Sequence, residues 1–257
     1  DLLMARVEEA YSDVAAADTG LVSMGAGDLF RTVTDNLRET LSRGANLPGW
    51  VVNRLLTELR DPINIALTRF FGDVFTYLDT RGTPDAPGAI PKRLLAALAE
   101  AKTLQAERGG EPIVVISHSM GGLIVYDAVT AWLPAMDPAD RPRIDLWCAA
   151  ASQVGLFEEM GRFIASDPAR YGTTPADGRE RLVPRPDRAV LGGWWNVWDQ
   201  NDFLSYRARD IIDGVDDAEW DSGAWFPMSH SAYFQHPSFF RELRRKLEAG
   251  ASAGWWR

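Results

Sequence analysis

The chain has very little cysteine and no long apolar run. Cys148 is the one cysteine among 257 residues, so no intramolecular disulfide can form, and we expect a reducing, cytoplasmic location. No uninterrupted apolar stretch approaches the roughly 20 residues that a membrane-spanning helix needs. The first residues, DLLMARVEEA, are acidic and do not resemble a signal peptide. The sequence therefore predicts no transmembrane segment.

Positive charge is also scarce. The chain carries 27 Lys and Arg residues against 36 Asp and Glu residues, for a formal net charge of −9, and its basic residues form no cluster. Because nucleic-acid binding needs concentrated positive charge, we expect no nucleic-acid partner. With 46% hydrophobic and 25% charged residues the composition is that of a globular protein. The length suits one large α/β domain or two small ones, and we expect a single domain over 1–257.

The periodicity of apolar residues changes near residue 73. Before that point the sequence favours helices and no strand, with DVFTYL at 73–78 as the first short β-prone run. Beyond it, apolar strands alternate with helices, which predicts a mostly parallel central sheet flanked by helices, an α/β class with a helical N-terminal third. The expected helices cover 1–17, 29–43, 49–60, 62–71, 91–108, 120–133 and 237–249, and the expected strands 112–117, 144–150 and 194–199. The polar segment 155–193 predicts either a lid or a mobile insertion.

The most informative stretch is PIVVISHSMGGLIVYDAV, residues 112–129. It combines a buried strand, a tight turn of small residues and an amphipathic helix, and Ser119 lies in the turn. Such a turn would hold the serine in a strained backbone conformation that lifts its hydroxyl above the sheet. Strand and helix would approach so closely that Ser117 and Gly121 must be small. The Met120 N–H opens the helix, so it can donate to an oxyanion.

This stretch resembles the nucleophile elbow of α/β hydrolases, Gly-x-Ser-x-Gly between a strand and a helix, with Ser117 in place of the first glycine. The resemblance covers about residues 73–249. It implies an α/β-hydrolase fold and a lipase- or esterase-like serine hydrolase that needs no metal or other cofactor. An incidental serine in an ordinary strand–turn–helix is the alternative. In the family, nucleophile, acid and histidine follow one another in that order along the chain.

Only three histidines can supply the base. His118 adjoins Ser119 and is expected to be structural, packing under the oxyanion side. His230 lies in a stretch of small and polar residues, followed by Tyr233 and the last helix, which is the usual place of the family's base. His236 directly precedes Pro237 and is the alternative. The resemblance therefore implies His230 as the general base.

The acid should follow the strand that precedes the histidine. Asp202 stands in the loop QNDFLSYRA after WWNVWD, and its DFLSY context resembles the family's turn; Asp199, at the end of the strand, is the alternative. Further acids are expected to form a solvated face rather than a Ca²⁺ loop, since they lack the Asp-x-Asp-x-Asp-Gly spacing with a closing Glu. These acids are Asp210, Asp213, Asp216, Asp217, Glu219 and Asp221.

The resemblance thus implies hydrolysis of a carboxylic ester, of a small molecule or a lipid, through Ser119, His230 and Asp202, with Met120 as an oxyanion donor. A peptidase or acyltransferase is one alternative. Another is a catalytically silent fold that binds a protein partner through its N-terminal helices. A second oxyanion donor would come from sequence preceding this chain or from the MGAGD turn at 24–28. The tryptophans at 194, 195 and 198 line the pocket floor or only the core, and Cys148 is expected to be an inert core thiol.

Overall fold

The computed structural model describes residues 49–170, 182–224 and 228–256. The chain divides into two units, Asp1–Val74 and Phe75–Arg257. The helix α3, Gly49–Thr80, is the described part of the first unit and ends in the second. The second unit holds every described strand and the candidate site. The helices expected over 1–17 and 29–43 lie outside the described residues.

The second unit is built on four parallel strands. They are β1 (Val114–His118), β2 (Ile144–Ala150), β3 (Leu191–Trp198) and β4 (Asp216–Glu219), and their order in the sheet follows their order in the chain. In the register of the sheet Ile116 lies opposite Cys148, and Cys148 opposite Trp195. All residues of β2 are buried, as the apolar run IDLWCAA predicted. The predicted α/β class with a parallel sheet is confirmed.

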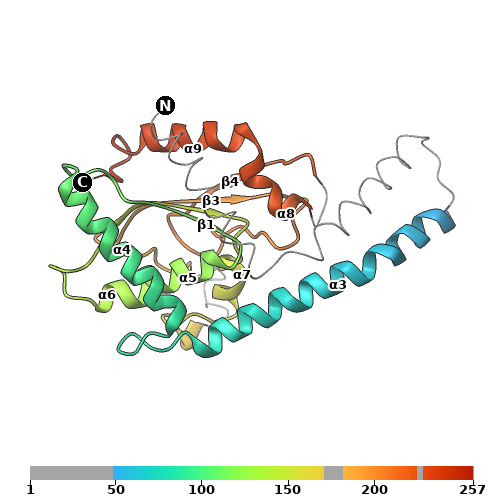
Figure 1. Cartoon of the computed structure of the whole chain (residues 1–257), viewed down its shortest axis with the longest axis horizontal. Helices are drawn as coiled ribbons and strands as arrows, with labels where there is room; N and C mark the ends of the chain where they lie inside the picture. The colour runs from blue at the N-terminus through green and yellow to red at the C-terminus, as the bar shows by residue number, and fades with distance from the viewer. Residues whose placement is uncertain (1–48, 171–181, 225–227, 257) are drawn as a thin grey trace, which may run out of the picture. The chain divides into compact units, whose positions relative to one another are not determined.

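Helices cover both faces of this sheet. Figure 1 shows α9 along one face and α4 and α5 along the other. Helices α4 and α9 confirm the helices predicted over 91–108 and 237–249 within two residues. The described helices of this unit after α3 are α4 (Ala89–Glu107), α5 (Gly121–Asp127), α6 (Leu133–Ala135), α7 (Val154–Glu159), α8 (Met228–Ala232) and α9 (Pro237–Ala249). Shorter turns are η2 (Ala128–Trp132, π-helical), η3 (Pro168–Arg170) and η4 (Tyr233–Gln235).

The core explains most of the tryptophan content of the strands. Trp194 stacks on Trp147 with ring centroids 4.5 Å apart, and Trp195 stacks on Phe239 of α9 at 5.5 Å. Both Trp194 and Trp195 are buried, so they serve as core residues. Trp198 is half-buried beneath the guanidinium of Arg207. Cys148 is fully buried in β2, and this burial raises the pKa of its thiol, in line with an inert core thiol.

The run DVFTYL is helical, although its residue types favour a strand. It forms the last turns of α3, which also runs without a break across the two helices expected over 49–60 and 62–71. The helical spacing exposes Phe75 and Thr76 and buries Tyr77. Tyr77 donates a hydrogen bond from its hydroxyl to Asp127 Oδ2 at 2.9 Å. This tertiary contact holds a helix where the intrinsic preference of Val, Phe, Thr and Tyr favours a strand.

Strand β4 was not predicted, because DDAE lacks the apolar residues that mark a buried strand. Asp217 belongs to the acids expected to be a solvated face, and for this residue the expectation is wrong. It accepts hydrogen bonds from Asn196 Nδ2 at 2.5 Å and from the N–H groups of Ala208 and Arg209 at 2.9 and 2.8 Å. Burial raises the pKa of this carboxyl. Asp217 therefore organises the loop before β4.

Part of the polar segment 155–193 is structured. It contains most of α7, the turn η3 and the start of β3, which begins at Leu191 rather than at the expected Trp194. Residues 171–181 lie outside the described residues, so the lid and insertion hypotheses stay predictions. Across the described ranges, no helix combines the length and the apolar character needed to cross a membrane.

Candidate active site

Ser119 lies at the junction of β1 and α5, in a backbone conformation that side chains rarely adopt. Its φ is 53°, in the left-handed region, where a non-glycine residue is costly and points to a functional constraint. The Ser119 N–H donates to the carbonyl of Ala150 at 2.9 Å, and the Ser119 carbonyl accepts from the N–H of Gly122 at 2.9 Å. These two bonds fix the turn on both sides. The strained conformation predicted from the sequence is confirmed.

The turn is more tightly packed at Gly122 than at Gly121. A Cβ on Gly121 would lie 3.5 Å from Ser117 Cβ, which is ordinary contact, so an alanine would fit there. A Cβ on Gly122 would overlap the Ser152 hydroxyl and lie 3.0 Å from Ser152 Cβ. The close approach is thus between Gly122 of α5 and the segment after β2. Gly121 lies against Ser117, as expected, but the tighter approach is one residue further along, at Gly122.

Ser117 has a packing role that explains its presence. Its Oγ accepts a hydrogen bond from Trp147 Nε1 at 2.8 Å, and both side chains are buried. An indole N–H that is buried without an acceptor costs about 1–3 kcal/mol. A glycine at this position would leave the Trp147 donor without this partner.

The structure brings Ser119, His230 and Asp202 together, although they come from distant parts of the chain. The distance between Ser119 Oγ and His230 Nε2 is 2.8 Å. His230 Nδ1 lies 2.9 and 3.0 Å from the two carboxylate oxygens of Asp202. A carboxylate only accepts, so Nδ1 carries the proton and Nε2 is left to accept from the serine hydroxyl. We call this arrangement the Ser119–His230–Asp202 chain.

The three residues of the Ser119–His230–Asp202 chain differ in their exposure to solvent. The Asp202 side chain is fully buried, the His230 ring is 15% exposed and Ser119 is half-buried. A buried carboxylate needs several hydrogen bonds, and Asp202 also accepts from the Leu204 N–H at 3.0 Å. The serine end is thus the accessible end, where a substrate can arrive.

Tyr233 is a member of the site that the sequence did not single out for this purpose. Its hydroxyl donates to Asp202 Oδ2 at 3.1 Å, and the side chain is completely buried. Burial first, and then the charge of Asp202, raises the pKa of this phenol, so it stays a donor. Its position three residues after His230 was the available signal, because that spacing places the base and the tyrosine on neighbouring faces of one helical turn.

The two alternatives to His230 and Asp202 have other partners. Asp199 accepts hydrogen bonds from the N–H groups of Asn201 and Ser222 at 2.8 and 2.9 Å, so it organises the loop around Asp202. His236 is the N-cap of α9 and meets the ring of Trp220 edge to face at 5.3 Å. Within the described part of the chain, neither residue bonds to Ser119 or His230.

The third histidine, His118, contacts the segment that carries His230. Its ring centroid lies 5.0 Å from that of His230 and 5.7 Å from that of Phe234. Its Nε2 lies 2.6 Å from the main-chain carbonyl oxygen of His230. The side chain directly before Ser119 is therefore joined to the backbone of the histidine that Ser119 meets.

Met120 is the residue that was predicted to donate its N–H to an oxyanion beside Ser119. Met120 is the N-cap of α5, and its N–H bonds to no acceptor among the described residues. The MGAGD turn at 24–28 lies outside the described residues. Met120 as one oxyanion donor, and either source for the second donor, therefore stay predictions.

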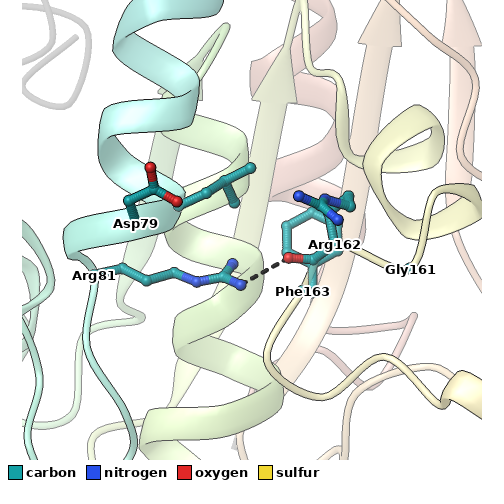
Figure 2. A pocket seen from close by; sticks show the side chains of 6 residues that line it. Asp79, Arg81, Gly161, Arg162 and Phe163 are labelled. Carbon is teal, nitrogen blue, oxygen red and sulfur yellow. Dashed lines mark hydrogen bonds between the residues drawn. The ribbon is translucent and has the colours of Figure 1, made fainter.

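No group of three or more His, Cys, Asp or Glu side chains within the described ranges could hold a metal ion. A small polar pocket of about 270 Å³ lies elsewhere, lined by Leu78, Asp79, Arg81, Gly161, Arg162 and Phe163. Figure 2 shows the Arg81 guanidinium in it, donating to the main-chain carbonyl of Arg162. Its second nitrogen donates to Asp127, so the charge of Arg81 is already paired. None of the lining residues belongs to the Ser119–His230–Asp202 chain.

Comparison with known proteins adds no identification: no protein-family model matches the chain, and neither the curated proteins nor the solved structures gave a significant match.

Proposed function

We propose that this protein is a serine hydrolase of the α/β-hydrolase fold that cleaves a carboxylic ester of a small molecule or lipid. The observation that carries the proposal is the continuous Ser119–His230–Asp202 chain, with bonds of 2.8 and 2.9 Å, next to a serine at φ 53°. A strained serine, a histidine that accepts from it and a buried carboxylate that orients the histidine form the arrangement of an activated nucleophile.

In the proposed mechanism His230 Nε2 takes the proton of the Ser119 hydroxyl while Oγ attacks the ester carbonyl carbon. The resulting oxyanion accepts a hydrogen bond from the Met120 N–H at the start of the helix. His230 then returns the proton to the leaving alcohol, and an acyl-enzyme remains. Water, deprotonated by His230, attacks the acyl carbon and releases the acid, which restores the Ser119 hydroxyl.

Asp202 fixes the tautomer of His230 and stabilises the imidazolium that forms in each half of the reaction. Its bonds from Leu204 and Tyr233 hold the carboxylate in place during both steps. The preference for esters over amides comes from the lipase- and esterase-like SHSMGG turn, which is an argument from analogy.

The test is covalent labelling with a fluorophosphonate, followed by intact-mass analysis. We expect one adduct on the wild-type protein and none on Ser119→Ala. Ser231→Ala is the matched control, since Ser231 is exposed and adjoins His230, and it should label like the wild type. An adduct that persists in Ser119→Ala would contradict the proposal. A panel of p-nitrophenyl esters and peptide amides would then separate an esterase from a peptidase.

A further inference from the structure

We infer that His118 is a positioning residue that ties the backbone of His230 to the strand carrying Ser119. This role rests on the proposed function. Its basis is the contact of 2.6 Å between His118 Nε2 and the His230 carbonyl oxygen. A carbonyl oxygen only accepts, so His118 Nε2 carries the proton and donates.

Two adjacent residues of the Ser119 turn therefore hold one histidine at two points. Ser119 meets the His230 ring at Nε2, and His118 meets the main chain of the same residue. The ring bond changes during each proton transfer, because Nε2 alternates between acceptor and donor. The backbone bond involves no transferred proton and stays in place through the cycle. The hydrogen bond from His118 Nε2 to the His230 carbonyl oxygen thus fixes the position of the His230 backbone, and with it the position of the imidazole relative to Ser119 Oγ.

The segment that carries His230 needs such a support. Helix α8 has five residues, Met228–Ala232, which is far below the length at which a helix is stable by its own hydrogen bonds. Besides the bond of the His230 ring to Asp202, two side-chain hydrogen bonds of this segment lead to the same loop: Ser229 Oγ donates to the Asn201 carbonyl, and the Tyr233 hydroxyl just after α8 donates to Asp202. Both hold the segment to the loop after β3.

His118 and Ser119 join this segment to the end of β1 and to the turn that follows it by hydrogen bonds. A general base must stay within about 2.6–3.2 Å of the proton it takes, and a misplacement of about 1 Å can cost about 10²-fold in rate. Loss of the hydrogen bond from His118 should therefore lower kcat and leave KM nearly unchanged, since the bond positions the base.

Packing is the competing explanation, because the His118 ring also contacts the rings of Tyr233 and Phe234. Two variants separate the explanations. His118→Leu keeps an apolar side chain and removes the donor. His118→Gln keeps an N–H donor that can reach the position of the histidine Nε2 and removes the ring. His236→Leu is the matched control, since His236 lies outside the chain of hydrogen bonds.

The experiment measures kcat and KM for a p-nitrophenyl ester, the rate of fluorophosphonate labelling and the Tm of each protein. We expect His118→Leu to lose about 10- to 100-fold in kcat and in labelling rate, with KM within about twofold. His118→Gln should recover most of that loss, and His236→Leu should match the wild type. If His118→Leu fails to fold, the comparison of His118→Gln with His118→Phe, which keeps the ring without the donor, serves instead.

Equal losses in His118→Leu and His118→Gln, or no loss in His118→Leu, would overturn the positioning role. If the wild-type protein is still labelled by the fluorophosphonate, the proposed function stands in that case. A wild-type protein that neither labels nor turns over would overturn both. A change confined to Tm would show that His118 supports packing alone.

Discussion

Three groups contact the carboxylate of Asp202: the Leu204 N–H, the Tyr233 hydroxyl and the His230 ring, whose Nδ1 lies close to both carboxylate oxygens. Only the last was expected from the sequence. The order of serine, acid and histidine implied by the resemblance, together with the loop context of each candidate, predicted the Ser119–His230–Asp202 chain, whereas the order alone also allows Asp199 and His236. His118 and Tyr233 could not be given their roles in this way. His118 acts through a contact between residues 112 positions apart, which no local pattern encodes, and for Tyr233 the spacing of three residues from His230 was the one available signal.

Asp199 and Asp202 provide the sharpest comparison at this scale, since they stand three residues apart and are both buried. Asp202→Asn should lower kcat by about 10³-fold or more, because the amide cannot hold His230 in the required tautomer. Asp199→Asn should change kcat only a few-fold and reduce the free energy of unfolding by about 1–3 kcal/mol, since its carboxylate accepts two buried N–H groups.

Ester hydrolysis and urea unfolding of both variants provide the measurements. A loss of turnover in Asp199→Asn equal to that in Asp202→Asn, at unchanged stability, would contradict the assignment of the acid.

At the scale of the elements, sequence patterns predicted the buried strands and the flanking helices well. Strand β2 and helix α9 have the bounds predicted for them, because an uninterrupted apolar run and an amphipathic period are strong signals. The differences at 73–78 and at β4 have one physical cause. Tyr77 and Asp217 are held by partners distant in sequence, Asp127 and Asn196, and these contacts override the local preference of each segment.

At the junction of β1 and α5, Gly121 and Gly122 should differ in their tolerance of a larger residue. Gly122→Ala should destabilise the fold and reduce turnover, because its Cβ would overlap the Ser152 hydroxyl. Overpacking of this kind typically costs about 1–3 kcal/mol. Gly121→Ala should be tolerated, as its Cβ meets only Ser117 Cβ at 3.5 Å.

The measurement is the free energy of unfolding of both variants together with the labelling rate of Ser119. Ser152→Ala added to Gly122→Ala should restore part of the loss, because it removes the hydroxyl and leaves a Cβ contact of 3.0 Å. Greater damage from Gly121→Ala than from Gly122→Ala would show that the close approach lies elsewhere.

In the second unit, a buried ionic cluster joins the end of α3, helix α5 and the loop after α7, none of which belongs to the sheet. Asp127, fully buried in α5, accepts hydrogen bonds from the Tyr77 hydroxyl at 2.9 Å, from Arg81 Nη1 at 2.7 Å and from the Ile164 N–H at 3.1 Å. We call these four residues the Asp127 cluster. The Arg81 guanidinium continues to the carbonyl of Arg162, in the pocket of Figure 2. The cluster thus fastens the end of α3 and the loop after α7 to the helix that follows Ser119.

The free energy of unfolding should depend on pH through the Asp127 cluster, because the Asp127 carboxyl is buried. Burial raises the pKa of Asp127 above its ordinary value of 3.8, while Arg81 lowers it. Arg81→Leu would leave the carboxylate buried without its cation, a change that typically costs about 3–5 kcal/mol near neutral pH. The same change should raise the pKa of Asp127 in the folded state further. The folded variant then binds a proton at pH values where the unfolded chain has lost it, so stability is gained as the pH falls toward 3.8 and lost as it rises through the folded pKa.

We therefore expect the difference in unfolding free energy between the wild type and Arg81→Leu to be largest near pH 7 and to shrink toward pH 5. Urea unfolding between these two values measures it, and Arg81→Leu combined with Asp127→Leu is the control, since a pair without charge should lose this pH dependence. A difference that grows as the pH falls would contradict the role of the carboxylate. Protonation of Asp127 would then destabilise the folded Arg81→Leu variant instead of removing its buried, unpaired charge.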